Sequence, residues 1–443
     1  MLGQRNELTV VTPVRPGHAD ALRAVLARKP DPGFDACPEV HFARWALLER
    51  PAPVPALVAG TLLPALETPS LLFATTFDGP RSAHLANLAN RIPQLLDSVY
   101  QYCPGYPQPA PQRRPKDIVR YLARHRIAAN TFFVGTPGVS VDDMRNEAKL
   151  RTLMDWLLDG AGGLAAEDPV HFHLLLRARV QATPELAALL EAPRPVRPRG
   201  FLGWALYRIR MHAGPSRWFP PPGFFRRALL GFARETERSD KPPPPGQVFP
   251  LPDPQWLAKQ IQRMQRAESE DVNRTNRITL YSDVKPGLFR RLLLRMSLFF
   301  MNTVARSTLD GRLSGNEQIH SARWVVTDGG RHLLFLSNYD GSWEQYLTAF
   351  SKNYDVAHGV TAIWSSADTF PRTRYLVCGG AIHEQPFKQA VRANQIATQF
   401  WYSAYADQQL TVEAINRNHR IRCNVAKPAL TPEEALGWLE EFH

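Results

Sequence analysis

The sequence predicts an α+β fold in which two copies of one βαββαβ unit pack sheet to sheet within one chain. Residues 6–151 recur in diverged form at 276–422, and an internal repeat of this length predicts two similar units. The predicted strands are apolar on both faces, so a helix layer on one face leaves the other face to be covered by a second sheet. Between the copies lies a segment of different composition, rich in proline and arginine.

Matched strings locate the duplication along the chain. The first copy turns at Val14–Gly17 and the second at Val284–Gly287, and both turns contain a Pro-Gly pair. The other matched strings, first copy before second, are Val40–Trp45 with Ile319–Trp324, Leu71–Gly79 with Leu333–Gly341, and Ser140–Asp142 with Thr411–Glu413.

The elements of the first copy follow the order strand, helix, two strands, helices, strand and helix. Ser140 is expected to cap the last helix, with Asp142 and Asp143 in its first turn and Gly160 after its end. The predicted elements are Leu8–Val14, His18–Arg28, Val40–Leu48, Leu71–Phe77, Ser82–Tyr100, Asp117–His125, Thr131–Val134 and Val141–Leu158.

The second copy repeats this order with a shorter hairpin. Asp328-Gly329-Gly330 is expected to close a tight turn, because these residues accept positive φ. The first copy has a proline-rich loop at Pro51–Pro69 in the same place. The predicted elements are Ile278–Val284, Leu288–Arg306, Ile319–Thr327, His332–Tyr339, Trp343–Trp364, Phe387–Asn394, Phe400–Ala404 and Val412–Arg420.

An antiparallel βαββαβ unit is the ferredoxin-like pattern. Strict alternation along the second copy places His320 on the face of Trp324 and Arg323 on the opposite face, and the first copy repeats this arrangement. Both faces carry mostly apolar residues. We therefore predict that the two sheets face each other and make an α+β barrel inside one chain.

The connecting segment divides the chain into four predicted parts. These are a first repeat at 1–158, a Pro/Arg-rich connector at 159–275, a second repeat at 276–430 and a C-terminal tail helix at 431–443. Within the connector we predict a strand at Val170–Arg179, a short helix at Thr183–Leu190 and a helix at Pro254–Glu268, separated by proline-rich loops.

Composition narrows the class of protein. Apolar residues make up 44% of the chain and aromatic residues 10%, as in a folded protein. Four scattered cysteines and no leader-like start predict a reducing compartment without secretion, and no apolar run is long enough for a membrane span. We expect a cytoplasmic protein or one on the inner face of the membrane; homo-oligomerisation stays open.

The net charge of +12 is concentrated in one segment. Residues 194–238 hold ten arginines and two glutamates, interleaved with aromatic residues. This pattern suits an anionic membrane surface, a basic connector packed on the barrel, or nucleic acid, although no known nucleic-acid module is present and that partner is not expected. The apolar, arginine-bearing helix Leu288–Arg306 supports the membrane interpretation, or it is an ordinary buried helix of the second copy.

The matched His-x-x-Arg positions are the main candidates for chemistry. His41 and His320 could ligate haem iron or act as acid–base groups, and Arg44 and Arg323 could clamp a carboxylate. The alternative is structural: satisfied core histidines, with each arginine paired to the aspartate that ends the third strand. That aspartate, Asp78 or Asp340, either caps the helix that follows it or acts as a distal acid over a cofactor.

Other motifs carry weaker signals. His171 and His173 would lie on one face of a strand, as in metal sites, but no carboxylate or cysteine completes a ligand set. Phe370–Arg374 and Trp401–Tyr405 could line a pocket or pack as strands. The chain has no Gly-rich phosphate loop, Gly-x-Ser-x-Gly, Walker or Rossmann motif.

The repeat resembles the dimeric α/β-barrel superfamily in fused tandem form, which includes dye-decolourising peroxidases, chlorite dismutases and small haem-degrading monooxygenases. The strings at His41–Trp45, Phe77–Gly79, Phe370–Arg374 and Trp401–Tyr405 are most similar to a group of uncharacterised bacterial tandem-repeat proteins. The Gly-x-x-Asp-Gly motif of the dye-decolourising peroxidases would fall on Asp78 and Asp340, with Thr75 and Ser337 in place of the leading glycine.

The resemblance implies a peroxidase- or monooxygenase-like oxidoreductase that acts on an apolar small molecule with haem as cofactor. Asp340, Arg323 and His320 would be its catalytic residues. His320, His358, His383, Arg372 and Arg374 would be the candidates for binding the cofactor. The rival hypothesis is a non-catalytic protein that binds or scaffolds at a membrane surface through the arginine-rich segment 194–238.

Overall fold

The computed structural model describes most of residues 5–193 and 275–441. The described residues are 5–28, 33–49, 69–109, 111–193, 275–307, 316–352, 354–371, 373–374, 378–405 and 410–441, with the isolated positions 258 and 262. Three predicted features lie outside the described residues. They are the arginine-rich segment 194–238, the loop at Pro51–Pro69 apart from its last residue, and the helix at Pro254–Glu268 apart from positions 258 and 262.

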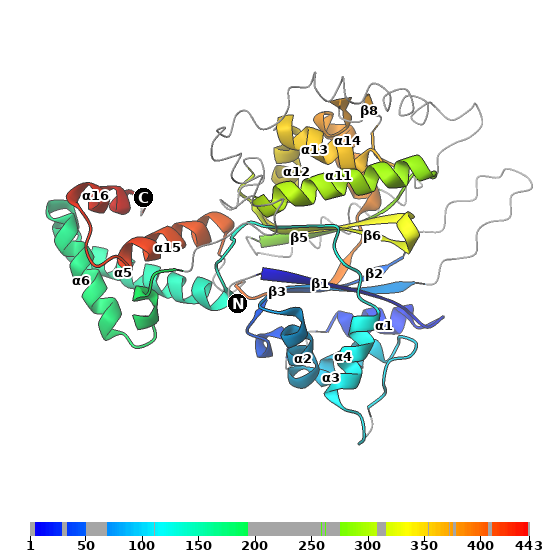
Figure 1. The fold of residues 1–443 in the computed structure, drawn as a ribbon, viewed down its shortest axis with the longest axis horizontal. Coiled ribbons are helices and arrows are strands. Elements are labelled where there is room, and N and C mark those ends of the chain that lie inside the picture. The colour runs from blue at the N-terminus through cyan, green and yellow to red at the C-terminus, as the bar shows by residue number, and fades with distance from the viewer. Residues whose placement is uncertain are drawn as a thin grey trace, which may run out of the picture.

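Two four-stranded antiparallel sheets form the centre of an α+β fold (Figure 1). The first has the order β1 (Arg5–Pro13), β3 (Ser70–Asp78), β2 (Val40–Leu48) and β10 (Thr398–Ser403). The second has the order β4 (Thr131–Val134), β6 (Ile319–Thr327), β7 (His332–Asp340) and β5 (Thr275–Asp283). Asp328 and Gly329, with φ of 50° and 66°, turn the β6–β7 hairpin as expected. A short pair, β8 (Thr373–Arg374) and β9 (Cys378–Gly379), lies apart.

The last strand of each predicted repeat pairs with a strand of the other predicted repeat. β4 belongs to the first repeat but pairs with β6, and β10 belongs to the second repeat but pairs with β2. The segments that lead into these strands stay with their own repeat: Ile127 N donates to Thr9 O at 2.9 Å, and Ile396 N donates to Thr279 O at 3.0 Å. Each segment therefore links an edge of one sheet to an edge of the other, and neither repeat completes its sheet alone.

Both faces of the central strands are buried, as the apolar pattern predicts. Every residue of β2 and β7 is buried. On the faces between the sheets, Ala46, Leu72 and Val325 join an apolar cluster with Leu334 and Leu336. Stacking the sheets explains why these strands lack a polar face.

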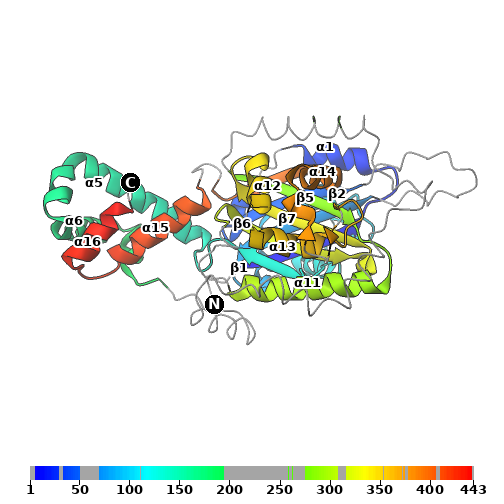
Figure 2. The same ribbon diagram turned by 90° about the horizontal axis from the view of Figure 1, so that it is seen from above.

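Helices cover the outer face of each sheet (Figures 1 and 2). The first sheet carries α1 (Ala19–Leu26), α2 (Arg81–Arg91), α3 (Pro93–Tyr100) and α4 (Pro115–Arg124). The second carries α11 (Leu288–Ser307), α12 (Trp343–Lys352), α13 (Tyr354–Trp364) and α14 (Glu384–Asn394). The single helix predicted at Ser82–Tyr100 is wrong: Pro93 lacks an N–H donor and starts a new helix. The helix predicted at Trp343–Trp364 is likewise two helices, α12 and α13.

A helical lobe projects from one end of the sheets, and we use this name for α5 (Val141–Glu167), α6 (Pro169–Ala182), α15 (Val412–Val425), α16 (Pro432–Glu440) and the short 3₁₀ helix Ala187–Leu190 (Figures 1 and 2). Its core includes Met154, Phe172, Leu176, Val425 and Trp438.

Two predictions for this region are wrong. The run predicted as a strand at Val170–Arg179 lies in α6, because Phe172, Leu176 and Val180 fall on one helical face and pack into the core of the lobe. The helix that starts at Val141 continues through Gly160 and ends at Glu167. A side chain at Gly160 would contact no other atom, so close packing does not require glycine there. None of the helices in the described part of the chain combines the length and apolarity needed to cross a membrane.

Candidate functional site

A β-bulge in each sheet turns a matched histidine toward the other sheet. The pairing of β2 with β3 shifts register between Val40 and Phe42, and that of β6 with β7 shifts between Ile319 and Ser321. An extra residue at this point reverses the alternation and re-aims its side chain. The prediction that each histidine shares a face with its tryptophan is therefore wrong: His320 packs edge-on against Phe42 of the first sheet, with ring centroids 5.4 Å apart.

Each bulged histidine lies against the aspartate that ends the neighbouring strand. His41 Nε2 is 2.9 Å from Asp78 Oδ1, and His320 Nε2 is 2.7 Å from Asp340 Oδ1. Both histidine side chains are fully buried, and the aspartate side chains are 8% and 10% exposed. The structure therefore brings together His320 and Asp340, two of the three predicted catalytic residues, but seals them from solvent.

The second oxygen of each aspartate accepts a hydrogen bond from the start of a helix in the helical lobe. Val141 N donates to Asp78 Oδ2 at 2.9 Å, and Val412 N donates to Asp340 Oδ2 at 2.6 Å. The expected capping role is thus real, but the prediction of which helix is capped is wrong. The capped helices are α5 and α15, 63 and 72 residues further along, and not the helices that follow each strand. A negatively charged carboxylate at these positions stabilises the helices, because the N-terminus of a helix carries a partial positive charge.

The two halves of this cluster differ in the residue opposite the aspartate. Arg5 lies opposite Asp78 in the β1–β3 ladder, and Thr275 lies opposite Asp340 in the β5–β7 ladder. Arg5 donates to Thr136 Oγ1 at 2.9 Å and to Val139 O at 2.8 Å. Tyr405 contacts both histidines: its ring stacks on His320 and meets His41 edge-on, with centroid separations of 5.5 and 6.1 Å.

Burial sets the protonation of the cluster. It lowers the pKa of His41 to about 4, and the nearby Arg5 charge adds to this, so His41 is neutral at neutral pH. Burial also raises the pKa of Tyr405 and keeps its phenol protonated. Burial alone would raise the pKa of Asp78, but contact with His41, the Arg5 charge and the Val141 N–H lower it overall. The first half is therefore a neutral imidazole beside a carboxylate balanced by Arg5.

Arg44 and Arg323 cross between the sheets, and neither pairs with Asp78 or Asp340, so the predicted structural pairing is wrong. Arg323 donates to Leu8 O at 3.0 Å and Thr75 O at 2.9 Å, and lies 3.4 Å from Glu7 Oε2. Arg44 donates to the carbonyls of Ile278 and Ser337, at 2.7 and 2.8 Å. The bonded atoms belong to the opposite sheet, so both guanidinium groups hold the sheets together instead of facing a ligand.

Thr75 and Ser337, which stand where the Gly-x-x-Asp-Gly motif has its leading glycine, each form a hydrogen bond to a helix. The sequence did not indicate this role. Thr75 Oγ1 lies 2.9 Å from His84 Nε2, and Tyr346 donates to Ser337 Oγ at 2.9 Å. His84 Nδ1 also lies 3.0 Å from Glu39 Oε1, which resembles a nucleophile–base–acid set. Because tyrosine replaces histidine in the second copy, the shared role is to anchor a helix on its sheet.

The surroundings of His320 do not fit a haem iron. A histidine that ligates iron presents a ring nitrogen to the open space that the macrocycle fills. Asp340 occupies Nε2, and Tyr405 and Phe42 pack against the fully buried ring.

The remaining predicted ligands do not join this cluster. His358 lies in α13 and exposed His383 immediately precedes α14, both in the outer helical layer. Arg374 lies in β8, and Arg372 lies outside the described residues. His173 is buried, with Nε2 3.0 Å from Asn424 O, whereas His171 is exposed, so they form no metal site. Across the described ranges, His, Cys, Asp and Glu form no group that could hold a metal ion.

Comparison with protein-family models, curated proteins and solved structures finds no match for this chain.

Proposed function

We propose that the protein binds an anionic membrane surface, with α11 lying in the plane of the interface. The observation that carries this proposal is an exposed apolar stripe on a helix that has four arginines and no acidic residue. Leu288 is 82% exposed and Phe299 62%, and the other members of the stripe are Leu292, Met296 and Phe300. We call these five residues the α11 stripe.

Helical spacing puts the α11 stripe on one side of the helix. Leu288, Leu292, Met296 and Phe300 follow each other at four-residue intervals, and Phe299 lies between the last two turns. The opposite side buries Leu294 and Leu298 in the core over the second sheet. The inner side of α11 alone packs the helix onto the second sheet. The apolar residues on its outer side therefore do not contribute to this packing and call for another role. Exposed apolar patches on a folded protein mark interaction surfaces.

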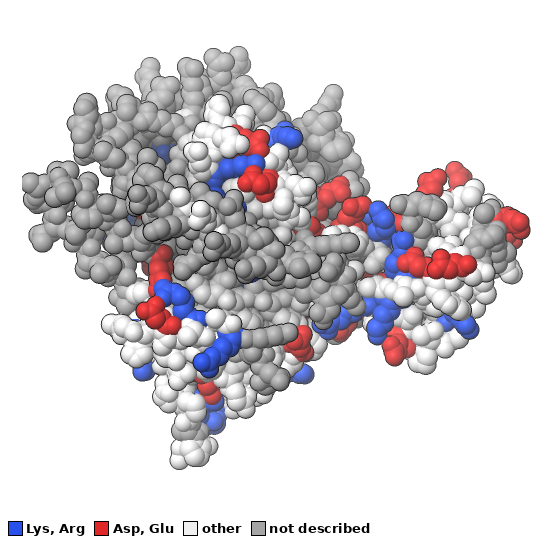
Figure 3. Space-filling model, turned by 180° about the vertical axis from the view of Figure 1, so that it is seen from behind, with Lys and Arg blue, Asp and Glu red and all other residues white. Residues whose placement is uncertain are grey.

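The charges beside the α11 stripe favour lipid over a protein partner. Arg291 and Arg295 flank the stripe, and among the described residues neither has an ion-pair partner. By contrast, on the helical lobe seen from behind, basic and acidic side chains are interspersed (Figure 3). An arginine near an anionic surface adds about 1 kcal/mol, and full burial of an apolar side chain adds about 1.5–3 kcal/mol. The stripe and its arginines together give enough for reversible binding.

The arginine-rich segment 194–238 would add to this contact. It carries ten arginines against two glutamates, so it repels the basic α11 and is a poor cover for the stripe. Both regions attract the same anionic headgroups. We therefore propose that they act together at the membrane.

Vesicle flotation tests the proposal. We expect the full chain to float with phosphatidylcholine vesicles that contain phosphatidylserine and to stay behind without it. The double variant Leu292→Glu/Phe299→Glu should lose at least about tenfold in binding, because two charges enter the apolar layer. Leu436→Glu is the matched control, since Leu436 is 55% exposed on α16, away from α11.

Two results would overturn the proposal. One is a full chain that fails to float with anionic vesicles. The other is a double variant that floats as well as the control while chromatography shows that the variant abolishes self-association, which would assign the stripe to a second copy. A chain lacking 194–238 separates the contribution of that segment from that of α11.

A haem-dependent oxidoreductase acting on an apolar small molecule is the second proposal. The resemblance of the matched strings to the dimeric α/β-barrel superfamily motivates it, whereas the matched histidine–aspartate pairs are sealed from solvent and do not reach a substrate. Because His320 does not fit an iron ligand, the other ligand candidates are His358 and His383. A Soret band after addition of haemin, lost in His358→Ala or His383→Ala, would support this proposal. Protein that takes up no haemin would contradict the haem proposal. If a Soret band does form, we expect it to be unchanged when His320 is replaced.

We also propose that the two sheets are ferredoxin-like repeats closed into an intrachain barrel of the dimeric α/β type. The strand pairing across the predicted repeats supports this, and so do the bridges Val10–Arg126 and Leu280–Gln395 at the two open edges. The matched bulges, aspartates and arginines support a pseudo-twofold axis between the repeats.

A further inference from the structure

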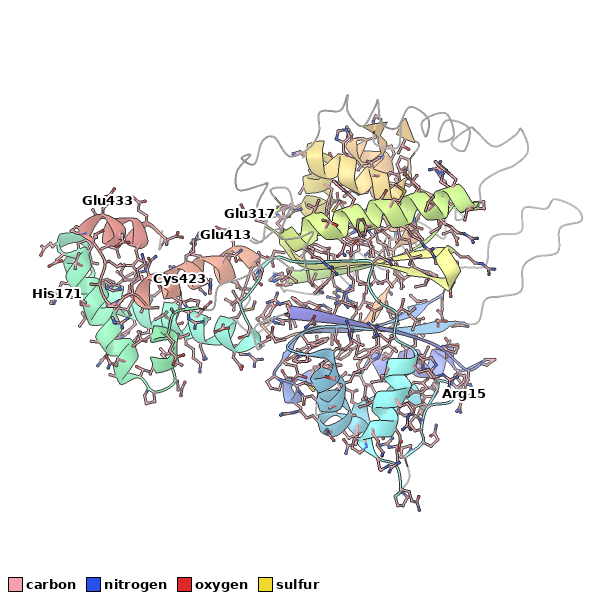
Figure 4. The ribbon with its side chains drawn as sticks, in the orientation of Figure 1. Arg15, His171, Glu317, Glu413, Cys423 and Glu433 are labelled. Carbon is pink, nitrogen blue, oxygen red and sulfur yellow. The ribbon has the colours of Figure 1, made fainter. Side chains whose placement is uncertain are left out.

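An open groove lies between α5 and α15 in the helical lobe. Glu413 lines it, and Figure 4 places this residue at the end of the lobe nearest the sheets. Ala148 of α5 and Ala414 of α15 also line the groove, and because their side chains end at Cβ they leave space between the helices. Its volume of about 520 Å³ is within the range of small-molecule sites, about 300–1,000 Å³.

The side-chain amide of Asn418 lacks a partner in the wall of this groove. Asn418 is only 6% exposed, and it follows Ala414 by one helical turn, on the side of α15 that lines the groove. Its amide forms no hydrogen bond within the part of the chain that the structure describes. By contrast, the buried amide of Asn338 bonds to Ser321 and Trp401. Because a buried amide without a partner costs free energy, Asn418 points to a ligand that both donates and accepts hydrogen bonds.

Three cationic side chains, Lys149, Arg151 and Arg417, also line the groove. Each pairs with a carboxylate at 2.8–2.9 Å, and the partners are Glu185, Asp155 and Glu413. The partner side chains are 51–72% exposed, so water screens these pairs and a ligand can replace the carboxylates. Among the described residues, the lining holds three cations and one anion, a net charge of +2. This balances a phosphate monoester, whose charge at pH 7 is about −1.5 to −2.

The N-terminus of α15 is not the anion-binding element here. Val412 N donates to Asp340 Oδ2 at 2.6 Å, and Ala414 N donates to Thr411 Oγ1 at 3.1 Å, so these backbone donors already have acceptors. Contact with an anion is therefore left to the side chains. Guanidinium and ammonium groups form strong, charge-assisted hydrogen bonds to phosphate oxygens.

We propose that this groove binds a phosphate monoester that carries hydroxyl groups, either a soluble metabolite or the headgroup of a lipid. Lys149 and Arg417 contact the phosphate from opposite helices, and the Asn418 amide bonds to a hydroxyl group, which donates and accepts as the amide does. The groove shares no residue with the α11 stripe. Binding here is therefore a property separate from the membrane contact proposed for α11.

Labelling of the full-length protein with phenylglyoxal, which modifies arginine, tests the proposal when mass spectrometry reads each site. Glycerol 3-phosphate at about 10 mM should slow the labelling of Arg417 at least about tenfold, as a Kd of about 1 mM or tighter requires. Arg420 is the internal control, because it lies on the same helix, pairs with Glu441 and does not line the groove. Its labelling should not change, so a general attraction of phosphate to the basic chain is separated from binding in the groove.

Two variants assign the contacts. Lys149→Gln should raise the Kd for glycerol 3-phosphate about tenfold, because it removes a charge-assisted hydrogen bond. Lys427→Gln is the matched control, since Lys427 forms a similarly exposed pair with Glu434 in the same lobe but does not line the groove. Asn418→Leu keeps the size of the side chain and should remove the preference for glycerol 3-phosphate over inorganic phosphate.

Equal protection of Arg417 and Arg420, or no protection of Arg417, would overturn the proposal, and so would an unchanged Kd in Lys149→Gln. If the buried variant Asn418→Leu fails to fold, Lys149→Gln decides alone, because Lys149 is 52% exposed. Vesicles that contain phosphatidic acid distinguish the two sources: a lipid headgroup predicts that they protect Arg417 more strongly than glycerol 3-phosphate does, and a soluble metabolite predicts the reverse. Leu292→Glu/Phe299→Glu should still bind glycerol 3-phosphate, so the two proposals fail separately.

Discussion

Replacing Arg323 with methionine is expected to lower the free energy of unfolding by about 3–5 kcal/mol. The guanidinium bonds to backbone and side-chain oxygens of the opposite sheet and lies 3.4 Å from Glu7. Methionine fills similar space but leaves Glu7 buried without this cation. Urea unfolding, followed by tryptophan fluorescence, measures the loss.

Two matched variants isolate the cause. Arg331→Met makes the same change at an exposed position of the β6–β7 hairpin and should have an effect below about 0.5 kcal/mol. Arg44→Met should destabilise less than Arg323→Met, because no described carboxylate pairs with Arg44. Burial and the charges of Arg323 and Arg277 lower the pKa of Arg44 to about 9. Equal losses for both buried arginines would contradict the assigned role of Glu7.

Asp340→Ala is expected to destabilise the protein by about 3 kcal/mol, since it removes the partner of three buried groups, which belong to Val412, His320 and Thr275. Val412 N loses its acceptor at the start of α15, and His320 loses its 2.7 Å contact. The damage should reach the helical lobe, because the carboxylate joins the end of β7 to the first turn of α15. Hydrogen exchange of the Val412 amide should quicken as the helix start frays.

Asp155→Ala is the control for this substitution, because Asp155 is 51% exposed and, among the described residues, pairs with Arg151 alone, on the same helix. Its loss should stay below about 0.5 kcal/mol. Asp340→Asn should recover much of the stability, since the amide oxygen can accept from Val412 N. Unchanged exchange at Val412 in Asp340→Ala would contradict the link between the sheet and the lobe.

Much of the framework could be predicted because it depends on local pattern. Continuous runs of mostly apolar residues located the central strands, and Asp328-Gly329-Gly330 located the hairpin. Ser140 was correctly expected to cap a helix: its hydroxyl accepts from Asp143 N at 3.1 Å. The duplication also identified the residues that recur as matched pairs, including His41 and His320.

The helix break at Pro93 has a local cause, but the other main failures come from contacts between residues far apart in the chain. A bulge depends on the partner strand, so alternation within β2 or β6 could not show that the histidines turn toward the other sheet. The predicted strand at Val170–Arg179 is a helix because its apolar residues, on one helical face, pack into the core of the lobe. A string in the sequence marked Tyr405, but no local signal marked Arg5, whose partners Thr136 and Val139 are 131 and 134 residues away.

The sequence by itself determined the α+β class and the burial of both faces of the central strands, because each follows from periodicity within short windows. Only the tertiary structure decided that the last strand of each predicted repeat pairs with a strand of the other, that the histidine–aspartate pairs are sealed between the sheets, and that those aspartates cap helices of the helical lobe. The physical reason is that buried polar groups take whatever partner the packed chain brings within hydrogen-bonding distance. For Asp340 that partner is Val412, 72 residues away.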